Sequence, residues 1–229
     1  NSIAKSYYNG TINIDETSTV YMMQVTTMGY INVKGTLNAT WQTNVYGNGM
    51  ITVTDDATFN TAALHITGKD YSGRDNTDAG RVGKPALVVV DKANFNVGKV
   101  LSNNGADYSY NSSKGINIGT IEGKKGVLDI KNGAKVNIYM ANGETANIGA
   151  DGTVNVNAST FNVACRAAGG TATLANAGTV YTTGEANLAV AVTGAGWFYM
   201  NGVTLDADTK LDGAKVAFIN GTTDIVGST

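Results

Sequence analysis

Short segments with alternating apolar residues recur along the chain, and each is followed by a turn and a further apolar position. Alternate side chains of a strand point to the same side, so each segment predicts a short strand with one buried face. The matches are Ile12/Ile14 before Val20, Ile51/Val53 before Phe59, Leu87/Val89 before Phe95, Leu128/Ile130 before Val136, Val154/Val156 before Phe161, Ala172/Leu174 before Val180 and Val203/Leu205 before Leu211.

The spacing of these segments indicates a repeat of about 18–22 residues, interrupted by insertions. One such strand cannot bury its apolar face alone, whereas stacked coils align equivalent side chains and pair every backbone N–H and C=O group. The pattern therefore predicts an all-β chain folded as a right-handed parallel β-helix (β-solenoid). About eleven coils at roughly 4.8 Å each would form a rod about 50 Å long.

Details of the repeat favour a solenoid over the alternative, an antiparallel sandwich or barrel. Small residues stand two positions before the second apolar residue, at Ala57, Ala93, Ala134, Ser159 and Gly178. Asparagine follows that residue at Asn60, Asn96, Asn137 and Asn162, where stacked amides can hydrogen-bond to one another. The chain has a single proline, as expected when most strands have neighbours on both sides. An antiparallel fold would also give many short strands, but it does not require the whole unit to repeat.

Two polar stretches, residues 68–85 and 103–115, interrupt the repeat and are expected to project as loops. The repeat resumes directly after each of them. Residues 1–229 are therefore expected to form one β-solenoid domain.

The composition excludes several classes of protein. Sixteen basic and 18 acidic residues give a net charge of −2, which leaves no basic surplus for a nucleic-acid partner. No apolar run reaches the length of a transmembrane helix, and the single cysteine, Cys165, cannot form an intrachain disulfide. Low charge (15%) with so little cysteine favours an extracellular, cell-surface location in a bacterium.

The segments GINIGTIEGKKGVLDIKNGAKVNI (115–138) and GTVNVNASTFNV (152–163) resemble the passenger regions of bacterial autotransporter-type adhesins and other secreted β-helical surface proteins. The resemblance covers most of residues 10–220 as a pattern. It implies a β-helical surface protein, and it carries over no functional residues because these families share a scaffold without a common active site.

The candidate chemistry is sparse. The only histidine, His65, and Cys165 lie far apart in the sequence, which argues against a cysteine–histidine pair, and no cofactor or metal is expected. Asp70, Asp75 and Asp78 could bind Ca²⁺, but they lack EF-hand and β-roll spacing, so a solvated loop is the favoured interpretation. Arg74 and Arg81 share that loop and provide the best location for a carbohydrate-active site. The candidate interaction residues are Asp70, Arg74, Asp75, Asp78, Arg81, Tyr108, Tyr110, Trp197 and Tyr199.

Trp197 and Tyr199 alternate with Phe198 and Met200, so one pair is expected in the core and the other on the surface. The favoured function is a non-enzymatic surface scaffold or adhesin that binds a host or neighbouring cell through a glycan or protein. The first alternative is a self-assembling subunit of a fibre or surface layer, since solenoid ends expose unpaired strand edges. The second is a carbohydrate-active enzyme.

Overall fold

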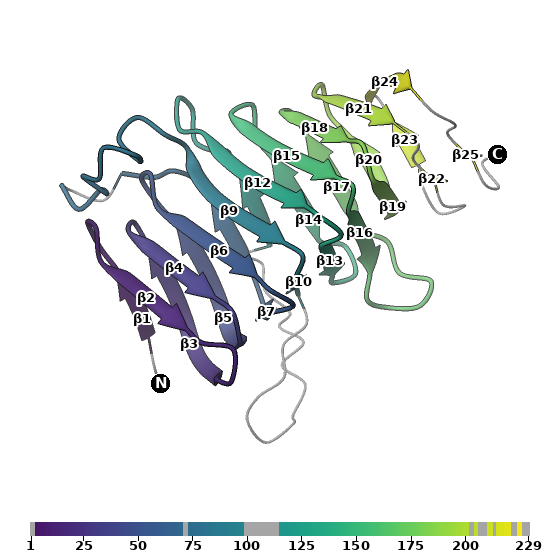
Figure 1. The fold of residues 1–229 in the computed structure, drawn as a ribbon. Coiled ribbons are helices and arrows are strands. Elements are labelled where there is room, and N and C mark those ends of the chain that lie inside the picture. The colour runs from purple at the N-terminus through teal and green to yellow at the C-terminus, as the bar shows by residue number, and fades with distance from the viewer. Residues whose placement is uncertain are drawn as a thin grey trace.

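The chain folds as a stack of parallel strands (Figure 1). The computed structural model describes residues 3–70, 73–98, 115–201, 204–205, 210–212, 214–220 and 224–225. All named elements in these ranges are β-strands, and every pairing between them is parallel. Parallel pairing excludes the antiparallel sandwich or barrel.

Each coil contributes strands to three faces. The first face is a nine-stranded sheet of β2 (Thr11–Ile14), β4 (Tyr30–Val33), β6 (Met50–Thr54), β9 (Ala86–Asp91), β12 (Gly126–Lys131), β15 (Gly152–Asn157), β18 (Thr179–Thr182), β21 (Trp197–Asn201) and β24 (Lys215–Asn220).

The other two faces form one continuous fourteen-stranded sheet, because β3 (Thr19–Thr27) and β5 (Thr36–Val45) run from the second face onto the third. The second face continues with β7 (Thr58–Thr61), β10 (Asn94–Val97), β13 (Lys135–Met140), β16 (Thr160–Cys165) and β19 (Glu185–Ala189). The third contains β1 (Ile3–Ser6), β8 (Leu64–Ile66), β11 (Ile116–Ile118), β14 (Thr145–Ile148), β17 (Thr173–Asn176), β20 (Ala191–Thr193) and β23 (Lys210–Asp212). A separate pair joins β22 (Thr204–Leu205) to β25 (Asp224–Ile225).

This arrangement confirms the predicted parallel β-helix. The described part of the first face has nine strands, so the expectation of about eleven coils was too high. Stacked residues are 18–30 positions apart in most coils and 36–52 apart where the chain inserts the segments after β8 and β10. Because insertions lengthen some of the coils, the chain forms fewer coils than a uniform repeat of about 20 residues would give.

The core consists of columns of inward side chains that continue from coil to coil. Ile51, Leu128 and Val154 occupy one such column and are fully buried, as predicted. In β9, however, the inward pair is Val88 and Val90. Of the predicted pair, Leu87 is only partly buried, and Val89 is buried but pairs in register with Thr52 and Asp129 on the outer side. The run ALVVVD does not alternate, so its sequence gives no sign of which residues point inward.

The last two sequence matches lie on other faces than the first five. The pair Ala172/Leu174 belongs to the third face, and Val180 lies on β18 of the first face. Leu205 lies on β22 and Leu211 on β23. The apolar-turn-apolar unit therefore occurs at more than one corner of the coil. Its recurrence identifies the solenoid without fixing which face each segment occupies.

An asparagine ladder runs along the second face. Side-chain amides of successive coils hydrogen-bond at 2.7–2.9 Å in the order Asn38, Asn60, Asn96, Asn137, Asn162 and Asn187. The predicted stacking of the four sequence-identified asparagines is confirmed, and the ladder extends one coil further at each end. On the third face, Asn147, Asn117 and His65 form a shorter chain of contacts at 3.3 and 3.0 Å.

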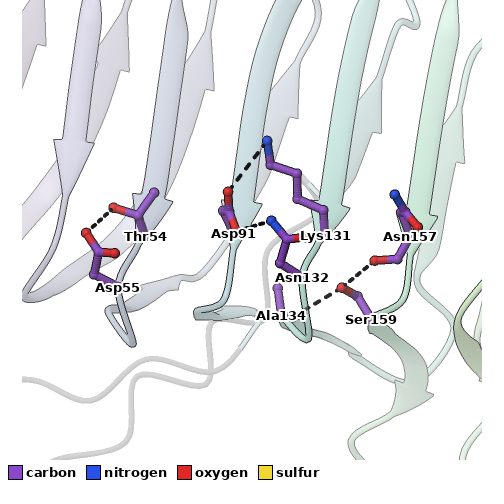
Figure 2. Close-up of polar contacts among 8 residues, drawn as sticks. All are labelled: Thr54, Asp55, Asp91, Lys131, Asn132, Ala134, Asn157 and Ser159. Atoms are coloured by element: carbon purple, nitrogen blue, oxygen red, sulfur yellow. Dashed lines mark hydrogen bonds and ion pairs between the residues drawn. The ribbon is translucent and has the colours of Figure 1, made fainter.

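The turns between the first and second faces are short, and hydrogen bonds and an ion pair link the turns of neighbouring coils (Figure 2). Asp91 accepts a hydrogen bond from the side chain of Asn132 at 2.7 Å and pairs with Lys131 of the next coil at 3.5 Å. The Oγ of Ser159 donates to the carbonyl oxygen of Asn157 and accepts from the backbone N–H of Ala134. The predicted small residues at this corner, Ala57, Ala93, Ala134 and Ser159, are all buried.

Candidate interaction surfaces

A long insertion between β8 and β9 lies along the corner of the first coils instead of projecting from it (Figure 1). We call its described residues, 67–70 and 73–85, the corner loop. The backbone N–H of Tyr8 donates to the carbonyl oxygen of Arg74, and Oδ1 of Asn9 accepts a hydrogen bond from the backbone N–H of Thr77. The hydroxyl of Tyr30 donates to Asp78 at 2.8 Å. Asn48, which precedes β6, also bonds to the loop, so the loop contacts three successive coils.

Arg81 and Asn48 fix the loop from beneath. Arg81 is 7% exposed; its Nε donates to the carbonyl oxygen of Asn48 at 2.9 Å, and its terminal nitrogen donates to that of Pro85. The side chain of Asn48 donates to the carbonyl oxygens of Asn76 and Arg81, both at 2.8 Å. Burial lowers the pKa of Arg81 from its usual value. The guanidinium thus links the corner loop to the coil, and we call this pair of hydrogen bonds from Arg81 the bracket.

Two of the three predicted acidic residues of the loop, Asp70 and Asp78, have separate partners. Asp70 pairs with Lys124 at 2.6 Å, and Asp78 accepts from Tyr30 and from the backbone N–H of Gly80. These hydrogen bonds lower the pKa of Asp78, the one from Gly80 most strongly. Among the residues that the structure describes, no three histidine, cysteine or acidic side chains are grouped so as to hold a metal ion.

Asp75 is the least satisfied of these carboxylates. Its Oδ1 is enclosed and has no hydrogen-bond partner among the described residues. A Cβ on Gly47 would lie 2.1 Å from that oxygen, so the loop approaches the coil closely where Gly47 has no side chain. Burial raises the pKa of Asp75, the charge of Asp70 adds to this, and Lys124 opposes it.

A pocket of about 450 Å³ lies between the corner loop and the turn that contains Lys124 and Lys125. Asp70 and Asp75 line it together with Lys84. Residues 122–125 gave no sequence signal for this location, because only the fold brings that turn beside the corner loop. Arg74 lies outside the pocket lining, with its guanidinium 5.0 Å from the ring centre of Tyr7.

The aromatic residues predicted near the C-terminal end form a second surface, on the outer side of the first face. Phe198 and Met200 are buried while Trp197 is 41% exposed, which confirms the predicted alternation. The Trp197 and Tyr199 rings are stacked, with centroids 5.7 Å apart. Tyr181, on the preceding coil, lies 6.1 Å from Tyr199. Tyr181 could have been identified from the sequence because it follows the inward Val180 and pairs in register with Tyr199.

The remaining candidates are dispersed. Tyr108 and Tyr110 lie outside the described residues, as does the loop 103–115 except for Gly115. His65 contacts Asn117 on the third face, and Cys165 is a partly buried free thiol at the end of β16. The corner loop joins the first coils, whereas β21 with Trp197 lies toward the opposite end of the stack (Figure 1). The predicted residues therefore form two separate surfaces.

Comparison of the chain with protein-family models, with curated proteins and with solved structures gave no match. The described residues include no helix long and apolar enough to cross a bilayer.

Proposed function

We propose that the protein is a non-enzymatic extracellular scaffold of the bacterial cell surface, an adhesin that presents binding surfaces on a rigid β-helix. The observation that carries this proposal is the bracketing of the corner loop by the buried Arg81. A loop that is ordered before binding loses less conformational entropy when a partner docks. The resemblance of residues 115–138 and 152–163 to autotransporter-type passengers agrees with this function.

The bracket gives the loop an ordered outer surface. Val82 is 60% exposed, and it lines the pocket next to Gly83 and Lys84. An exposed apolar residue beside a polar pocket resembles the mixed composition of recognition surfaces. Arg81 donates to main-chain oxygens beneath this surface, which supports a structural role for this arginine over a catalytic one.

A cell-binding assay tests the proposal. Labelled protein is incubated with bacterial and epithelial cells, and bound protein is compared with that of a Val82→Asp/Lys84→Ala variant. We expect saturable binding that the variant weakens at least about tenfold, equivalent to roughly 1.4 kcal/mol. A Thr153→Ala variant, changed on the first face, is the control. Absence of saturable binding to either cell type, or equal binding by the loop variant, would reject this function for the corner loop.

The second candidate function, self-assembly into a fibre or surface layer, is supported by the edge strand β24. Phe218 pairs in register with the buried Met200 and so continues an inward column, yet it is 56% exposed. A second copy stacked on this edge would cover that ring. Negative-stain images and sedimentation at increasing concentration should show filaments that Phe218→Asp removes; a concentration-independent monomer would reject this candidate.

A further inference from the structure

The outer side of β15, β18, β21 and β24 has few charged groups. Lys215 is the single charged residue of these four strands. Its neighbours in the outward column are Trp197, Thr179 and Thr153. Among the residues whose side chains the structure describes, which do not include Asp206, Asp208, Asp212 and Asp224, no acidic group lies within 4.0 Å of its ammonium group. The described part of this surface therefore carries one positive charge, that of Lys215.

The aromatic rings of this surface adjoin that charge. The Lys215 Nζ lies 5.8 Å from the ring centre of Trp197, which in turn stacks on Tyr199. Tyr181 and Trp197 are each 41% exposed, so their rings are accessible on a flat face. We call Tyr181, Trp197, Tyr199 and Lys215 the aromatic patch.

We propose that the aromatic patch binds an acidic carbohydrate, an oligosaccharide that contains hexuronic acid. The C–H face of a pyranose ring packs on an aromatic ring, and tyrosine hydroxyls can exchange hydrogen bonds with sugar hydroxyls. A carboxylate on the same ring would form an ion pair with the ammonium group of Lys215. Successive coils are about 4.8 Å apart, close to the length of one sugar unit, so a linear chain along the stack meets one coil per sugar.

Charge complementarity favours this ligand over the other classes. A nucleic acid would require several cations to neutralise its phosphates, and the four strands supply one. A neutral glycan would use the rings but would gain no ion pair with the Lys215 ammonium group. This inference rests on the proposed function, since it names the partner class of the adhesin, but it concerns a surface separate from the corner loop.

Isothermal titration calorimetry with a galacturonic acid tetramer tests the proposal. The matched ligand is the same tetramer with its carboxylates methyl-esterified, which keeps the ring faces and removes the charge. We expect saturable binding of the acidic tetramer, at least about tenfold weaker binding of the ester, and weaker binding at higher salt. Lys215→Gln should equalise the two ligands, and Trp197→Ala should weaken both.

Tyr21→Ala provides the control, because Tyr21 is a similarly exposed aromatic residue on β3. Circular dichroism melting curves establish that each variant is folded. The proposal is overturned if no saturable binding occurs, if the ester binds as well as the acid, or if Lys215→Gln and Trp197→Ala leave binding unchanged. Cell binding that depends on Val82 and Lys84 would survive such a result, so failure here is distinguishable from failure of the proposed function.

Discussion

Asn137 donates its side-chain N–H to the side-chain oxygen of Asn96 at 2.8 Å, although 41 residues separate the two in sequence. Asn96 in turn donates to Asn60 at the same distance, across 36 residues. Each interior amide of the ladder thus both donates and accepts. The ladder keeps coils of unequal length in register on the second face.

Replacing an interior member of the ladder should destabilise the protein. Asn96→Ala leaves the Asn137 donor and the Asn60 acceptor without their partner, with an expected loss of about 1–3 kcal/mol in the free energy of unfolding. Urea unfolding followed by circular dichroism measures it. Asn94→Ala, an exposed asparagine of the same strand, should change stability little. Equal losses in the two variants would show that the ladder contributes no net stability.

A charge placed on either side of one strand should distinguish the inward from the outward column. Val154 is fully buried and Thr153 points outward on β15. Val154→Asp buries a carboxylate without a partner and should abolish cooperative thermal unfolding, whereas Thr153→Asp should shift the melting temperature only slightly. Comparable melting curves for the two variants would contradict the assigned faces.

Removing the bracket should free the corner loop. Arg81→Ala eliminates the hydrogen bonds to the carbonyl oxygens of Asn48 and Pro85, on the order of 1.5–3 kcal/mol for a charged donor. We expect faster thermolysin cleavage near Val82 and faster amide hydrogen exchange over residues 73–85. The control is Lys84→Ala, which changes an exposed residue of the same loop. A loop equally protected in both variants would show that Arg81 does not hold it.

Asp75 should make stability depend on pH. Burial raises the pKa of Asp75 in the folded state above its unfolded value of 3.8. Ionising Asp75 therefore costs more free energy in the folded protein than in the unfolded chain. This cost lowers stability at neutral pH. It disappears as the pH falls through the pKa of the folded state toward the pKa of the unfolded state. Asp75→Asn should raise the melting temperature at neutral pH and lose this advantage near pH ~4.

The matched variant for this titration is Asp56→Asn, in an exposed turn. If Asp75→Asn behaves like Asp56→Asn, the enclosed carboxylate does not contribute to the pH dependence.

The sequence was sufficient to predict the fold because inward positions repeat in every coil. The predicted inward residues Leu128, Ile130, Val154 and Val156 are all buried. The prediction was wrong in β9, where five consecutive apolar residues give no alternation from which to choose a face. Buried neighbours on the adjacent coils, and not the local pattern, place Val88 and Val90 inside.

The candidate surfaces were harder to predict. Trp197 and Tyr199 were correctly placed on one side of their strand, but their partners Tyr181 and Lys215 come from the coils before and after. The polar composition of residues 68–85 suggested a solvated loop, whereas Arg81 and Asn76 are buried against the coil. A buried arginine that pairs with main-chain oxygens has no signature in sequence.

The corners of the coil differ in what they tolerate. Between the first and second faces, small buried residues such as Ala93 and Ala134 leave no space for extra chain in the described coils. The corner after β8 accommodates the corner loop without disturbing the columns on either side. It is therefore the position at which a foreign epitope could be grafted, and the small-residue corner is where such a graft would split the stack.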